Sequence, residues 1–157
     1  MREAQKGNLE KLDKVTVATI QSSKYDIYSP LLSNQMFMYQ EELKGVFMLF
    51  LPQLKHKLFC LLDQELRKST FYFAPMLDNV ACFSEEASTC NLDASHIDKV
   101  AVYKEKLPNT HIFRVSEPNT IVVLVSTMVA ECILRRNIEG LYFSPVTQVK
   151  GKDKNAK

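Results

Sequence analysis

The pattern of hydrophobic and polar positions is clearest between Thr120 and Pro145. Residues 120–125 form a β-branched apolar run, too short and too uniform for an amphipathic helix, which predicts a fully buried strand. Ser126 suits a helix N-cap, and apolar residues follow it at helical spacing. Gly140 tolerates a positive φ after that helix, and residues 141–143 resemble a second strand. The stretch therefore predicts a strand, a helix and a strand in succession.

A similar pattern begins at Ser33. In both stretches a phenylalanine follows the serine by 17 residues and a proline follows it by 19. The first stretch predicts a helix over residues 33–44, ended by Gly45, and a strand over 46–51. Two interpretations stay open: an internal strand–helix–strand duplication, or two unrelated strand–helix–strand segments.

The other segments predict mostly strands. Residues 15–20 fit an edge strand, and residues 53–67 carry leucines on one helical face, which favours a helix. The alternative for that segment is a strand over 58–62 with a polar turn over 63–68. Further strands are expected over 71–73 and 80–83, with a bend at Pro75, and over 97–103 and 111–115, with a polar turn at 84–89. The prediction is an α+β fold, a mixed or antiparallel sheet with two or three helices packed on it.

Composition agrees with one domain. A chain of 157 residues with 46% hydrophobic and 24% charged residues has ordinary globular values. We expect residues 1–149 to form the domain, with a weakly ordered lead-in at 1–14 and a disordered basic tail at 150–157. No apolar run approaches the roughly 20 residues of a membrane helix, and the polar N-terminus lacks a signal core.

The cysteines indicate the compartment. None of the four belongs to a CxxC pair or has a histidine at zinc-site spacing, which favours reduced, buried thiols in a cytoplasmic protein. A disulfide between Cys82 and Cys90 is the alternative, and it would require an oxidising compartment.

Charge is distributed unevenly. The formal net charge is +2, but residues 71–98 contain no lysine or arginine. One interpretation is a solvated loop region, and the other is a patch that faces a basic protein partner and steers its approach. Any exposed aromatic residue of this window would be an interface anchor. The acidic residues of the window are Asp78, Glu85, Glu86, Asp93 and Asp98.

Catalytic chemistry finds little support in the sequence. His96 neighbours two aspartates, and His111 begins a predicted strand, where a structural role is favoured over that of a general base. The four glycines cannot form a phosphate loop, and no metal-ligand cluster or nucleic-acid motif occurs, so no cofactor or nucleic-acid partner is expected. A small enzyme or ligand-binding module with a cleft at His96 or His111 is kept as the alternative.

Several sequence segments carry a family resemblance, among them the aromatic stretch 71–83 and the acidic turn 84–88 that follows it. The run 111–115 (HIFRV), the strand ending in Val125 and Ser126, and the phrase 138–146 (IEGLYFSPV) resemble bacterial polymorphic-toxin immunity proteins, closest to immunity family eleven. The likeness covers roughly residues 31–149 and is firmest over 96–146. The residues that match its structural motifs are His111, Phe113, Arg114, Ser126, Gly140, Phe143 and Pro145.

This resemblance implies a function. It implies a non-enzymatic cytoplasmic protein that binds the C-terminal domain of a cognate toxin and occludes its active site or a nearby surface. It transfers no contact residues and leaves the toxin's activity open. The acidic residues of 71–98 are the toxin-interface candidates that charge alone suggests.

Overall fold

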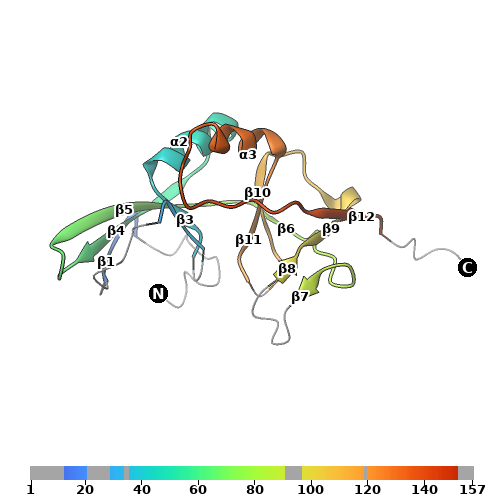
Figure 1. Ribbon diagram of the computed structural model, residues 1–157, viewed down its shortest axis with the longest axis horizontal. Helices are drawn as coiled ribbons and strands as arrows, with labels where there is room; N and C mark the ends of the chain where they lie inside the picture. Colours follow the sequence, from blue (N-terminus) through green and yellow to red (C-terminus); the bar gives the residue numbers. More distant parts are fainter. Residues whose placement is uncertain (1–12, 21–28, 34–35, 91–96, 119, 152–157) are drawn as a thin grey trace, which may run out of the picture.

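The computed structural model describes residues 13–20, 29–33, 36–90, 97–118 and 120–151 (Figure 1). Its largest sheet has five strands in the order β1-β4-β5-β3-β2. The β1–β4 pair is parallel, whereas the β4–β5, β3–β5 and β2–β3 pairs are antiparallel. The strands are β1 (Val15–Ile20), β2 (Leu31–Leu32), β3 (Met38–Tyr39), β4 (His56–Asp63) and β5 (Lys68–Pro75).

Three smaller sheets follow on the other side of the molecule. β10 joins β11 antiparallel and β6 parallel, β12 joins β9 in parallel, and β7 pairs with β8. Two α-helices, α2 (Glu41–Phe50) and α3 (Thr127–Leu134), lie next to each other on one side of the sheets (Figure 1). The remaining elements among the described residues are β6 (Asn79–Val80), β7 (Thr89–Cys90), β8 (Ile97–Lys99), β9 (Ala101–Tyr103), the 3-10 helix η2 (Lys104–Lys106), β10 (Ile112–Val115), β11 (Val122–Val125) and β12 (Thr147–Val149).

This arrangement confirms the predicted α+β class with mixed sheets and two helices. The edge strand over residues 15–20 is confirmed, because β1 occupies one end of the five-stranded sheet. The strand over 71–73 lies within β5, which ends at Pro75. The predicted lead-in and basic tail lie mostly outside the described residues.

The two faces of the large sheet bury different clusters. Phe59 and Tyr72 lie on one face with Leu61 and Ala74. On the opposite face, Tyr39 joins Phe47 of α2 and buried residues of α3 and β10 in a second cluster. Paired residues of neighbouring strands point to the same face of the sheet. Successive residues of β1, β4 and β5 therefore alternate between its two faces. The second cluster thus fixes both helices against the sheet.

The first predicted helix is displaced. Helix α2 begins at Glu41 rather than at Ser33, and it contains Gly45 together with the segment 46–50 that was predicted as a strand. The reason is burial, since Leu43, Val46 and Phe47 recur at helical spacing and face the core. The N-cap is Gln40, which makes no side-chain capping bond.

The preferred helix over residues 53–67 is wrong. Residues 56–63 form β4, and residues 64–67 form the turn to β5, as the alternative interpretation had it. Strand β4 carries apolar side chains on both faces, because Phe59 faces one cluster while Leu58 lies beside Phe73 on the other. Because both faces of β4 are apolar, its sequence lacks the alternation of apolar and polar residues by which a strand is usually predicted.

The stretch from 120 to 145 is partly as predicted. Strand β11 and helix α3 are present, but β11 is half-buried rather than fully buried. Residues 141–143 form no strand, and the next strand is β12. The two segments of the suspected duplication therefore adopt different structures, since Ser126 caps a helix whereas Ser33 precedes α2 by several residues.

Candidate functional site

Three of the five acidic candidates lie at one end of the molecule. Glu85 and Glu86 lie in the turn before β7, and Asp98 lies on β8, which pairs with β7. The Ser88 hydroxyl donates to the Ser84 carbonyl at 2.6 Å and accepts the Ala101 N–H at 2.9 Å, which ties this turn to β9. The side chains of Glu85, Glu86 and Asp98 are exposed.

The other two acidic candidates are placed differently. Asp78 is exposed and precedes β6, where its carbonyl accepts the Arg114 N–H at 2.9 Å. Asp93 lies outside the described residues, as does His96. The aromatic residues of the segment 71–98 differ in burial, since Phe71 is 53% exposed whereas Tyr72 is buried.

The motif residues lie around the start of α3 and the segment after it. His111 Nδ1 is 3.0 Å from Ser126 Oγ, and the same oxygen accepts the Val129 N–H at 3.4 Å as the helix cap. Gly140 has a φ of +80°, in the left-handed region that was expected of it. The remaining placements are Phe113 buried, Arg114 half-buried, and Phe143 and Pro145 exposed.

The contact between His111 and Ser126 pairs a base with a hydroxyl. The ring of His111 also packs edge-on against Phe50, with centroids 5.3 Å apart. Ser126 Oγ both accepts a helix N–H and is hydrogen-bonded to the imidazole, so the two side chains close the junction of β10, β11 and α3. A structural role accounts for every contact of this pair.

A second histidine, His56, is bound in the core. Its Nε2 lies 2.8 Å from the Tyr39 hydroxyl, and the rings meet edge-on. Burial raises the pKa of Tyr39 and, with the charge of Lys44 second, lowers the pKa of His56. The pair is a neutral hydrogen-bonded unit that joins Tyr39 of β3 to His56 of β4, and no local sequence pattern predicted it.

Two exposed apolar surfaces were not expected. On the sheet, Val17 is 61% exposed, and the β1–β4–β5 register places it in one row with Cys60 and Phe71. On the helices, Met128 is also 61% exposed, and the following segment carries Tyr142 at 96% exposure. Exposed apolar and aromatic side chains of this kind mark protein interaction surfaces. The only sequence patterns that pointed to these surfaces were the alternation of residues 15–20 and the aromatic run 71–73, and both belong to the sheet.

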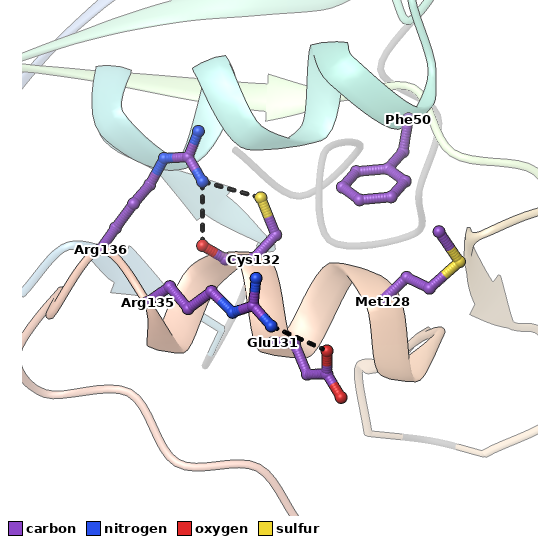
Figure 2. Close-up of a pocket in the computed structure, with 6 residues that line it drawn as sticks. All are labelled: Phe50, Met128, Glu131, Cys132, Arg135 and Arg136. Carbon is purple, nitrogen blue, oxygen red and sulfur yellow. Dashed lines mark hydrogen bonds and ion pairs between the residues drawn. The ribbon is translucent and has the colours of Figure 1, made fainter.

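A hollow lies between the two helices (Figure 2). It combines the apolar side chains of Phe50 and Met128 with the guanidinium groups of Arg135 and Arg136. Glu131 and Cys132 complete its lining. His111 does not belong to this lining, so the hollow is not the cleft at His111 that the alternative enzyme would use.

The described part of the chain offers neither a metal-binding cluster nor a membrane-spanning helix. Within it, no group of three or more His, Cys, Asp or Glu side chains could hold a metal ion. No helix among these residues has the length and apolar character to cross a membrane. Cys60, Cys82 and Cys132 are free thiols, so the alternative Cys82–Cys90 disulfide is not formed.

Comparison with known proteins identifies one family. The model of the Immunity protein family (Imm11) matches residues 53–148, which is more than half of the chain. The matched range runs from just before β4 into β12 and includes α3. No curated protein and no solved structure matches the chain.

Proposed function

The chain belongs to the immunity protein family (Imm11), and from this premise we propose that it binds and neutralises a cognate toxin by occluding the toxin's active site or a surface near it. The family match is the observation that carries the proposal, and membership suggests a non-enzymatic role. The partner would be the C-terminal toxin domain of a polymorphic toxin, and the site of action the bacterial cytoplasm.

The surface of the molecule supports this function. Neutralisation by occlusion needs an interface on the order of 1,600 Å² in total, with apolar or aromatic anchors inside a polar rim. Exposed side chains of that kind occur on the sheet at Phe71, on α3 at Met128 and after α3 at Tyr142. Free thiols at three described cysteines are in keeping with a reducing compartment.

The exposed acids add a second supporting feature. Glu85 and Asp98 lie near each other in the chain's fold, and their negative charge would attract a basic toxin surface over a long range at low salt. Steering of this kind affects the association rate more than the final affinity. The acidic residues therefore remain our proposed contributors to partner approach.

The proposal predicts a toxic domain encoded beside this chain's gene, and that domain is used for the test. That domain, expressed in cells, should arrest growth, and co-expression of this chain should restore it; the two purified proteins should elute together as a 1:1 complex. Growth arrest that persists at matched expression, with no complex formed, would reject the proposed function. A chain with several core residues replaced by aspartate serves as the unfolded control.

A further inference from the structure

The hollow between α2 and α3 has a volume of about 380 Å³. Phe50 ends α2 above it, and Met128 lies in the first turn of α3 below it (Figure 2). A space of this size accommodates one or two large apolar side chains. Met128 is unbranched and adaptable, so it can fit around a foreign side chain without strain in the helix.

The hollow also carries positive charge. Arg135 is 82% exposed, and its ion pair with Glu131 is long, at 3.7 Å. An exposed pair of this geometry contributes little to stability, so exchanging its carboxylate partner costs little. Two arginines and one glutamate leave a net charge of +1 on the lining.

Arg136 follows α3, and its position is fixed by contacts with Cys132 in the last turn of that helix. Its Nη1 donates to the Cys132 carbonyl at 2.9 Å and contacts Cys132 Sγ at 2.7 Å. Both contacts use Nη1, and within the described part of the chain Nη2 and Nε make no hydrogen bond that would compete with a ligand. A guanidinium held in this way is ready to bind a carboxylate without losing further freedom.

We propose that the hollow between α2 and α3 receives an acidic, apolar-anchored segment of the toxin. A large apolar side chain of that segment would fill the space between Phe50 and Met128, and a neighbouring carboxylate would pair with Arg135 and Arg136. This inference rests on the proposed function and names a surface for it. The positive lining selects an acidic occupant, since a basic segment would meet like charge.

This surface is separate from the acidic residues near β7 and β8. In Figure 1 the two helices lie on one side of the sheets, and β7 and β8 lie on the opposite side. One toxin contact therefore cannot depend equally on both, and substitutions on each side report separately. In this proposal the hollow between the helices makes the apolar contacts with the toxin, and the acidic residues near β7 and β8 only speed its approach.

The test compares two substitutions of equally exposed apolar residues. Met128→Glu removes one apolar wall of the hollow and repels the carboxylate of the toxin segment. The substitution should not disturb folding, because a negative charge in the first turn of α3 is favourable for the helix. Val17→Glu is the matched control, because Val17 has the same 61% exposure but lies on β1. Arg135→Glu tests the charged part of the hollow. Binding of each variant to the purified neighbouring toxin domain is measured by calorimetry, after circular dichroism confirms folding.

Met128→Glu and Arg135→Glu should each weaken binding at least about tenfold, while Val17→Glu changes it less than about threefold. If wild type binds and both hollow variants bind equally well, the inference is wrong and the proposed function stands. If Val17→Glu alone abolishes binding, the sheet is the docking surface and the inference is again wrong. If wild-type protein neither binds nor protects, the proposed function fails and this inference fails with it.

Discussion

At the scale of single residues, the pair of Tyr39 and His56 shows how burial sets protonation. Burial keeps the Tyr39 hydroxyl protonated, so it can donate to an unprotonated Nε2 of His56 across the 2.8 Å contact. A proton on Nε2 would remove the acceptor of the Tyr39 hydrogen bond and place a positive charge near Lys44. The Nζ atom of Lys44 lies 4.0 Å from the centroid of the Phe73 ring. Folding therefore favours the neutral imidazole.

This predicts a stability that depends on pH. Burial first, and the charge of Lys44 second, lower the folded-state pKa of His56 below its ordinary 6.5, so the unfolded chain binds the proton more readily. The contribution is fully present above about pH 7.5 and decreases as the pH falls through about 6.5 toward the folded pKa. Urea unfolding measured from about pH 8 to pH 5.5 should show the decrease in wild type and a smaller one in His56→Gln.

The glutamine variant is informative because its side-chain amide can still accept from Tyr39. Equal pH slopes in wild type and variant would show that His56 is not the titrating group. His111 and His96 are unchanged in both proteins and cancel in the comparison.

At the scale of elements, the two glycines near the helices behave in opposite ways. Gly45 lies inside α2, and a Cβ built on it would meet nothing within 4 Å. Gly140 follows α3 at a φ of +80°, where a side chain is strained. The sequence predicted that Gly45 ends a helix, which is wrong, and that Gly140 adopts a positive φ after a helix, which is confirmed.

Alanine at these positions should therefore have effects of opposite sign. Gly45→Ala should raise the free energy of unfolding by about 0.5–1 kcal/mol, because it removes glycine's excess freedom in the unfolded chain. Gly140→Ala should lower it by roughly 1 kcal/mol, the usual cost of a left-handed alanine. Chemical denaturation of both variants measures the two shifts, and destabilisation by Gly45→Ala would contradict the placement of α2.

At the scale of the whole molecule, the exposed acids near β7 and β8 lie on the side opposite the two helices (Figure 1). Replacing Glu85 and Asp98 with lysine should slow association with a basic toxin domain about tenfold at low salt, and the difference should vanish at high salt. Stopped-flow mixing at two salt concentrations measures it. Glu65→Lys, an exposed charge reversal in the turn between β4 and β5, is the control. Unchanged rates in the doubly substituted protein would remove the acidic residues from the recognition surface.

Features of the fold that depend on one residue or a short segment were predictable from the sequence, and features that depend on packing partners were not. The Ser126 cap, the end of a strand at Pro75 and the positive φ of Gly140 were predictable, because each is decided by one residue's own chemistry. The start of α2 and the identity of β4 were not. Segments 46–50 and 56–63 are apolar enough for either structure, and their packing partners decide between them.

Local patterns in the amino-acid sequence were sufficient to predict the α+β class, the edge strand, the helix after Ser126 and the family motifs, because these patterns do not depend on packing partners. Tertiary structure alone decided which residues meet. The hollow between Phe50 and Arg135, the neutral pair of Tyr39 and His56, and the exposed row at Val17 join positions far apart in the chain. Packing of both helices on one face of the sheet creates these surfaces, and no pattern within a single segment carries that information.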